Sequence, residues 1–118
     1  MADETQVKRS RGDGFNRATL LGRLAADPVV YAPKSDGGQH VARLRLAVNT
    51  GGEAEFFNAV AFGKSAEILG ELGRKGRQIL IEGRLHNAEY TDKEGVKQRA
   101  IEIRIDEFQL LGQKPAAE

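Results

Sequence analysis

Five stretches of the chain alternate polar and apolar residues, and one stretch between them has the period of a helix. The alternating stretches are residues 15–24, 40–49, 55–64, 78–90 and 96–111, and the helical one is 64–75. Side chains along a strand point to opposite faces in turn, so such alternation indicates strands with one buried face. In the last strand, Ile101, Ile103 and Ile105 are expected to point inward, and in the fourth, Leu85 shares a face with Ile79. The chain therefore predicts three strands, one short helix and two further strands.

This order of elements favours a mainly β fold, a five-stranded OB-fold barrel with the helix between the third and fourth strands. An SH3-like barrel usually lacks a helix at that place, and a parallel α/β fold would need more crossover connections. Gly22 interrupts the apolar face of the first strand, as expected where a barrel strand bends sharply. Asp27 and Pro28 are expected to stop that strand, and residues 34–38 to form a turn.

A chain of 118 residues is expected to form one domain. Residues 1–14 are interpreted as a flexible arm, because Lys8, Arg9 and Arg11 stand among small and polar residues with almost nothing to bury. The arm is either a solvated tail or a basic segment that touches phosphate. Residues 15–112 are assigned to the barrel, and residues 113–118 to a short tail.

Several classes of function are disfavoured by what the sequence lacks. There is no cysteine, which excludes disulfides, thiol catalysis and cysteine-ligated zinc. His40 and His86 have no metal-binding or catalytic-triad spacing, and the Gly37-Gly38 turn lacks the Lys-Ser/Thr of a phosphate-binding loop. No apolar run approaches the ~20 residues of a membrane span, and the first residues lack the apolar stretch of a signal peptide. We therefore expect a cytoplasmic protein that is not an enzyme and uses no cofactor or metal.

The third strand carries aromatic rings on both of its faces. Phe56, Asn58 and Phe62 point one way and Phe57 the other, so one buried face does not account for all three phenylalanines. Exposed rings beside Arg and Lys suit single-stranded nucleic acid, since rings stack on bases and cations meet phosphates. The alternative for Phe62, at the strand end, is a core residue.

The neighbouring strands place cations on matching faces. Arg43 and Arg45 share a face of the second strand, and Arg84, His86 and Tyr90 share a face of the fourth. If these faces lie on one side of the barrel, rings interleave with cations, and each stacked base contributes roughly 1–3 kcal/mol with little sequence preference. Structural alternatives stay open: a solvated face for the two arginines, a brace of the turn for Tyr90 and a surface polar role for His86.

The net charge of +1 does not by itself indicate a nucleic-acid-binding protein. The first 50 residues, however, hold eight basic and five acidic residues, so a groove built mostly from this half could still be basic. No helix rich in Arg, Asn or Gln is predicted that would enter a duplex major groove. The pattern thus favours binding of unpaired bases.

Several segments, in this order, resemble the bacterial single-stranded DNA-binding protein (SSB) family over about residues 15–112. They are NRATLLGRL with the following DP at 27–28, AEFFNAVAFGKSAE at 54–67, GRKG at 73–76, IEGRL at 81–85 and YTD at 90–92. The resemblance implies an OB-fold that usually assembles as a homotetramer and binds single-stranded DNA in replication, repair and recombination. The site residues that it implies are Phe56, Phe62 and Tyr90 for base stacking and Arg17, Lys64 and Lys75 for phosphate contacts, with Arg84 on the same face.

Four features depart from the family pattern. The loop between the second and third strands is only a few residues long, where many members carry a long basic loop with aromatic residues, and the chain has no Trp. Ala88 and Glu89 stand where some relatives are basic. The sequence ends at Glu118 without the acidic, Phe-ending tip that recruits other proteins, which indicates either a truncated chain or a specialised paralogue.

Three hypotheses follow. The first is sequence-tolerant binding and protection of single-stranded DNA by a cytoplasmic, nucleoid-associated homo-oligomer. The second is an OB-fold interaction or assembly module, an SSB paralogue with weak DNA binding. The third, an enzyme, has no carboxylate pair or histidine arrangement in its favour. The family precedent favours a tetramer, whereas composition alone allows a monomer or dimer; Phe15 and Phe108 are interpreted as core or subunit-contact residues, and Leu21 as a further contact residue.

Overall fold

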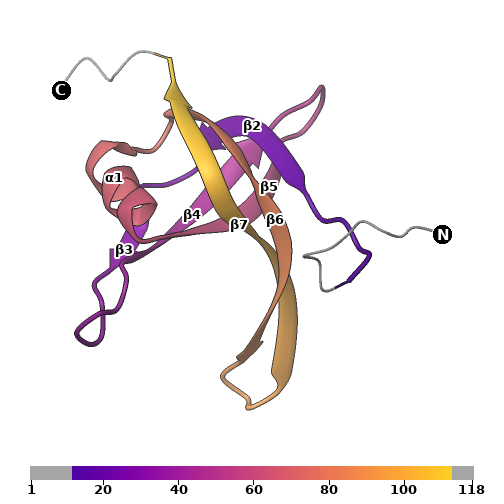
Figure 1. Ribbon diagram of the computed structural model, residues 1–118. Helices are drawn as coiled ribbons and strands as arrows, with labels where there is room; N and C mark the ends of the chain where they lie inside the picture. The colour runs from indigo at the N-terminus through magenta and orange to yellow at the C-terminus, as the bar shows by residue number, and fades with distance from the viewer. Residues whose placement is uncertain (1–11, 113–118) are drawn as a thin grey trace.

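The computed structural model describes residues 12–112 (Figure 1). The expectations for residues 1–11 and 113–118 lie outside the described residues. The helix α1 spans Lys64–Leu72, between β5 and β6. The strands are β2 (Ala18–Leu24), β3 (Val29–Tyr31), β4 (Val41–Val48), β5 (Glu55–Phe62), β6 (Gln78–Thr91) and β7 (Lys97–Leu111).

The strands form one sheet that closes on itself. Its order is β2-β6-β7-β5-β4-β3, and β2 also pairs with β4, so five strands complete a ring. The neighbours are antiparallel except β5 and β7, which run parallel. The predicted five-stranded barrel with one helix between its third and fourth strands is confirmed, and its topology is that of an OB-fold.

Strand β3 is an element that the sequence did not predict. Val29–Tyr31 pairs with β4 outside the closed ring, next to α1 (Figure 1). A strand of three residues is too short to display an alternating pattern. The strand therefore exists because β4 offers it an edge.

The bend predicted at Gly22 is confirmed. Strand β2 pairs with β6 from Ala18 to Arg23 and with β4 at Arg23 and Leu24, so it changes partner at this point. A Cβ atom on Gly22 would overlap the backbone carbonyl oxygen of Ala47. Only glycine lets β2 approach β4 closely enough to close the barrel here.

The core lies inside the barrel and beneath α1. The helix contributes Ala66 and Leu69, both fully buried. The barrel residues of the core are Leu24, Ala42, Leu44, Leu46, Ala59, Ala61, Ile79, Ile81, Ile103 and Ile105. The inward faces predicted for the second strand and for the barrel part of the fourth are confirmed.

Two apolar residues depart from the predicted burial. Ile101 is 59% exposed and Leu85 is 46% exposed, so the inward prediction for Ile101 was wrong. The β6–β7 hairpin is longer than the barrel and projects beyond it (Figure 1). Alternation gives the direction of a side chain, but it does not say where the barrel ends.

Candidate nucleic-acid interface

Strand register brings residues of four strands onto one outer surface of the barrel. Directly opposite residues of paired strands point to the same face. Across β4 and β5, Arg45 is opposite Asn58, and across β5 and β7, Asn58 is opposite Glu102. Glu102 is in turn opposite His86 on β6. We call this surface the aromatic face; its residues are Arg43, Arg45, Phe56, Asn58, Val60, Phe62, Arg84, His86, Tyr90, Glu102 and Arg104.

The strand register thus places the cation-bearing and ring-bearing faces on the same side of the barrel. Phe56 is 50% exposed, Phe62 is 38% exposed and Tyr90 is 54% exposed. Phe57, one residue along β5, is half-buried and packs against the core. The three rings are therefore open to a planar ligand, and the core interpretation of Phe62 is wrong.

Two arginines lie over two of these rings. The Cζ of Arg45 is 4.9 Å from the centroid of the Phe56 ring, and its Nη1 donates to Asn58 Oδ1 at 3.2 Å. The Cζ of Arg104 is 5.6 Å from the centroid of the Phe62 ring. Both distances are within the ~6 Å at which a cation is attracted to an aromatic face. Each of these two rings thus has a positive charge beside it, where the phosphate next to a stacked base would lie.

Other arginines of the region already have acidic partners. Arg43 Nη1 contacts Glu102 Oε1 at 3.1 Å, and Glu102 is only 8% exposed. The Arg84 guanidinium contacts Asp106 at 3.1 Å. These pairs, which neighbouring strands create, partly cancel the positive charge that the sequence predicted for this face.

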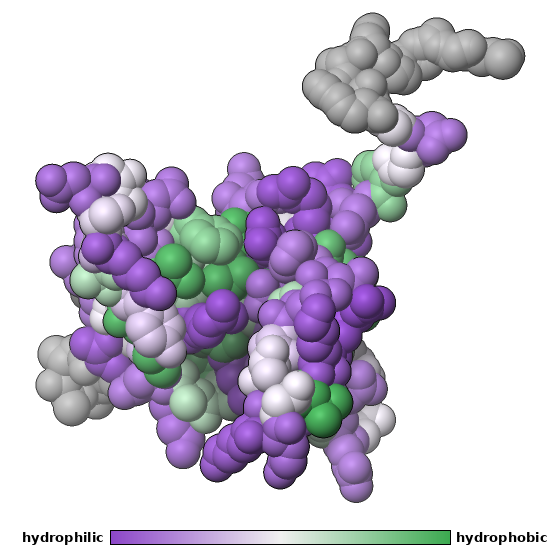
Figure 2. Space-filling view, turned by 90° about the horizontal axis from the view of Figure 1, so that it is seen from below, coloured by the Kyte–Doolittle hydropathy of each residue, from purple (hydrophilic) through white to green (hydrophobic). Residues whose placement is uncertain are grey.

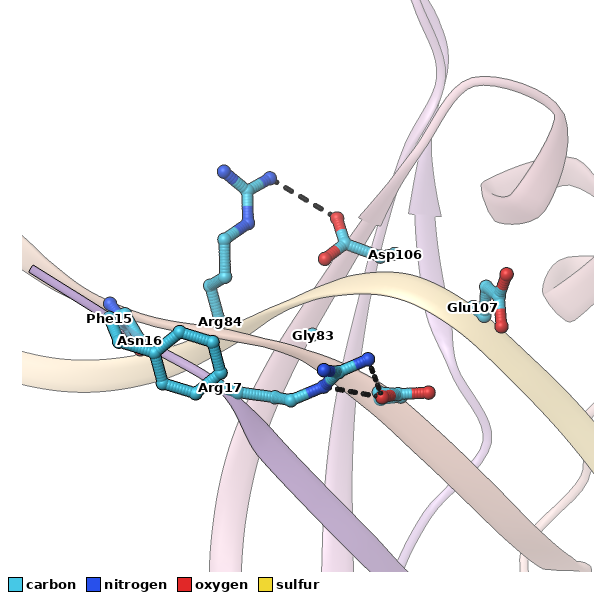
Figure 3. A pocket seen from close by; sticks show the side chains of 8 residues that line it. Phe15, Asn16, Arg17, Gly83, Arg84, Asp106 and Glu107 are labelled. Carbon is cyan, nitrogen blue, oxygen red and sulfur yellow. Dashed lines mark hydrogen bonds and ion pairs between the residues drawn. The ribbon is translucent and has the colours of Figure 1, made fainter. Parts of the chain in front are cut away.

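The positive charge of Arg17 is balanced by a carboxylate in the same way, and Arg17 lines a cavity of about 250 Å³. Its guanidinium contacts Glu82 on β6 at 2.5–2.6 Å. Figure 3 shows Arg17 and Arg84 reaching from the cavity wall to two different carboxylates. The Asn16 side chain donates to the Leu85 carbonyl at 2.8 Å and accepts from its N–H at 2.9 Å, which fixes this segment against β6.

A second cavity, of about 350 Å³, adjoins Tyr90. Ala88 and Ala100 are opposite each other on β6 and β7, and their small side chains leave this space between Tyr90 and the Arg43–Glu102 pair. Figure 2, viewed toward the projecting hairpin, shows a hollow with apolar residues at its base and hydrophilic ones around it. The surface therefore offers depth as well as flat rings.

The two predicted lysines lie off the sheet. Lys64 is exposed and begins α1, two residues after Phe62. Lys75 is exposed on the loop between α1 and β6, where its backbone N–H donates to Asp27 Oδ1 at 2.7 Å. The structure thus brings Lys64 to the end of the aromatic strand and leaves Lys75 on a separate loop.

Arg104 and Glu102 are residues of the face that the sequence-based prediction did not include. The last strand was interpreted only through its inward isoleucines, although Glu102 and Arg104 alternate with Ile103 and Ile105. Their polar character at alternate positions is the signal that identifies them as outward-facing.

The turn of the β6–β7 hairpin is organised by Asp92. Its carboxylate accepts from the Gln98 side chain at 3.0 Å and from the N–H groups of Val96 and Glu94 at 2.9 Å and 3.0 Å. These hydrogen bonds, that of Gln98 foremost, lower the pKa of Asp92 below its ordinary value of 3.8. The turn that follows Tyr90 is therefore held by a charged carboxylate.

Residues 12–112 contain no group of three or more His, Cys, Asp or Glu side chains that could hold a metal ion. No helix in this described part of the chain is long and apolar enough to cross a membrane.

The sequence matches known proteins. The model of the single-strand binding protein family matches residues 15–111. The "Single-stranded DNA-binding protein" of Xanthomonas campestris pv. campestris is 34% identical over 108 residues, which cover 84% of this chain and 62% of that protein. The "Single-stranded DNA-binding protein 1" of Xylella fastidiosa is 37% identical over 110 residues, covering 85% of this chain and 79% of that protein.

A "Single-stranded DNA-binding protein 1" of Streptococcus pyogenes serotype M6 is 38% identical over 104 residues, covering 82% of this chain and 77% of that protein. The match spans 62% and 59% of the lengths of the Xanthomonas campestris and Xanthomonas axonopodis relatives. Since the family model covers almost all of the described residues, the chain belongs to the single-strand binding protein family.

Proposed function

We propose that this chain binds and protects single-stranded DNA, with little sequence preference, through the aromatic face. The observation that carries the proposal is the placement of three exposed rings, Phe56, Phe62 and Tyr90, on one outer surface among arginines. Rings of this kind stack on any base, because every base has a π-face. The names of the relatives support DNA as the ligand.

Phosphate contacts are proposed for Arg17, Arg43, Arg45, Lys64, Lys75 and Arg84, as the family resemblance and the strand faces indicate. Arg45 supports this best, since it lies over Phe56 and has no carboxylate partner in the described part of the chain. Arg17, Arg43 and Arg84 would have to exchange their carboxylates for phosphates on binding. The activity proposed is binding in replication, repair or recombination in the cytoplasm, at the nucleoid, and not catalysis.

We also propose a homo-oligomer, with a tetramer favoured over a dimer. Phe15 is 86% exposed and Leu21 on β2 is 50% exposed, so both leave apolar area for a second copy. From Ala18 to Gly22, β2 pairs with β6 alone, and within residues 12–112 its other edge has no partner strand. An open edge can extend a sheet across a two-fold axis. Light scattering at micromolar concentration that gave the mass of one chain would reject the oligomer.

The test of the binding proposal is a fluorescence-anisotropy titration of labelled oligo-dT, at low and moderate salt, against the matching duplex. We expect tight binding to the single strand, weak binding to the duplex and a clear salt dependence. Replacing Phe56 and Phe62 together by Ala should weaken binding at least tenfold, since each stacked base contributes roughly 1–3 kcal/mol. A folded double variant with unchanged affinity would reject stacking. Equal affinity for both forms of DNA would favour the second hypothesis, an OB-fold interaction module.

A further inference from the structure

Strand β3 places a fourth aromatic side chain, Tyr31, in line with Phe62. Tyr31 is directly opposite Val41 on β4, and Val41 is directly opposite Phe62 on β5. Opposite residues of antiparallel strands point to the same face, so the three side chains form one row across three strands. With neighbouring strands about 4.8 Å apart, the Cα atoms of Tyr31 and Phe62 are roughly 10 Å apart.

The neighbouring residue on β3 confirms the direction of the Tyr31 side chain. Val30 is opposite Ala42, which is fully buried, and a Cβ atom built on Gly70 of α1 would lie 2.7 Å from Val30 Cγ2. Val30 therefore points toward the helix and the core. Because successive side chains of a strand alternate, Tyr31 points outward, and it is 51% exposed. Its exposed fraction is close to those of Phe56 and Tyr90 and larger than that of Phe62.

About half of the Tyr31 residue is open to solvent. Its hydroxyl makes no hydrogen bond within residues 12–112, and no arginine of that range lies over the ring. A single exposed aromatic residue is ordinary. An exposed ring in the same cross-strand row as Phe62, on a strand that adds nothing to the barrel itself, has the placement of a binding platform.

We propose that Tyr31 is a fourth stacking platform. It stacks on a base of the DNA strand that also lies on Phe62. This inference rests on the proposed function. It extends the aromatic face from the barrel onto β3, so that a bound strand crosses β5, β4 and β3 at the end of the barrel next to α1. The two Cα atoms are roughly 10 Å apart, so one stretch of 4–16 nucleotides, the length that one OB-fold covers, can reach both rings.

The composition of the chain allows a direct test. The protein has two tyrosines and no tryptophan, so in a Tyr90→Phe variant Tyr31 is the only tyrosine. Phe at position 90 keeps a ring for stacking. We expect unlabelled oligo-dT to quench the tyrosine emission of this variant, and the quenching to saturate at the same DNA concentration as binding measured by anisotropy. Saturated binding with unchanged tyrosine emission would overturn the inference.

The affinities of two variants at position 31 give a second, independent test. Tyr31→Ala should raise the Kd for oligo-dT by about 5- to 150-fold, the effect of losing one stacked base. Tyr31→Phe is the matched control, because it keeps the ring and loses only the hydroxyl; it should bind like the unaltered chain. Circular dichroism and the melting temperature show whether each variant folds.

These experiments distinguish a failure of the Tyr31 platform from a failure of the proposed function. A folded Tyr31→Ala variant with unaltered affinity would overturn the Tyr31 platform and leave the proposed function in place. An unaltered chain that does not bind oligo-dT at all would overturn the proposed function, and the Tyr31 platform with it.

Discussion

The guanidinium of Arg104 lies over the ring of Phe62, with its Cζ 5.6 Å from the ring centroid, and one of its nitrogens is 3.1 Å from His86 Nε2. Within the described residues Arg104 has no carboxylate partner, whereas Arg17, Arg43 and Arg84 each have one. The unbalanced positive charge of the aromatic face is therefore at Arg45 and Arg104, beside the two phenylalanine rings. This is the charge arrangement that a strand with stacked bases and neighbouring phosphates requires.

The first prediction concerns Arg104. Replacing it by Gln should weaken oligo-dT binding and reduce the slope of log K against log salt by about 0.7, the value for one phosphate contact on a single strand. Anisotropy titrations at several salt concentrations measure both quantities. Arg99→Gln is the matched control, because Arg99 is on the opposite face of β7 and contacts Glu89 at 3.3 Å. If both variants show the same slope as the unaltered chain, Arg104 makes no phosphate contact.

The second prediction concerns Glu102, whose carboxylate holds Arg43 on the aromatic face. Glu102→Gln keeps the shape and an acceptor oxygen but removes the charge, which leaves the Arg43 charge free for a phosphate. We expect tighter binding at low salt and a slope steeper by up to about 0.7. The control is Glu89→Gln, since Glu89 is an exposed acid of the opposite face. Weaker binding by a folded Glu102→Gln variant would mean that Arg43 acts only when Glu102 positions it.

The third prediction concerns the bend of β2. Gly22→Ala should lower the free energy of unfolding by about 1–3 kcal/mol, the usual effect of forcing an extra carbon into a closely packed position. The added Cβ would overlap the Ala47 carbonyl oxygen. Urea unfolding measures the change. Gly52→Ala is the control, because a Cβ at Gly52 would meet nothing within 4 Å. Equal stability of the two variants would show that β2 tolerates a side chain at its change of partner.

The fourth prediction concerns pH. The pKa of Asp92 is lowered in the folded protein by its hydrogen bonds with Gln98, Val96 and Glu94, so it lies below the ordinary value of 3.8. A group whose folded pKa is lowered contributes stability above its unfolded pKa and loses it as the pH falls through the folded pKa. The hairpin turn should therefore keep its amide protection at pH 5 and lose it below about 3.8.

Hydrogen exchange at the Val96 and Glu94 amides, followed by NMR, measures this loss. In an Asp92→Asn variant the acid-dependent step should disappear, since the amide side chain does not titrate. A titration of the Asp92 carboxyl with a midpoint at or above 3.8 would contradict the prediction.

The sequence by itself determined which side chains share a face. The alternation of β4 and β5 was enough to group Arg43 with Arg45 and Phe56 with Phe62, because the direction of each side chain follows from the period of its own strand. It also determined the order of strands and helix, and with it the OB-fold. Gly22 was recognisable because a glycine in an apolar face marks a bend.

Only the tertiary structure decided which of these groups meet. Arg43 and Glu102 are 59 residues apart and are joined by the register of β4, β5 and β7, which no local pattern specifies. The same register places Tyr31 in the row of Phe62, on a strand too short to be recognised from its sequence. Ile101 is exposed because the hairpin extends beyond the barrel. Periodicity is a property of neighbouring residues, whereas register and barrel length arise from pairing between distant ones, and these decide the charge and the extent of the aromatic face.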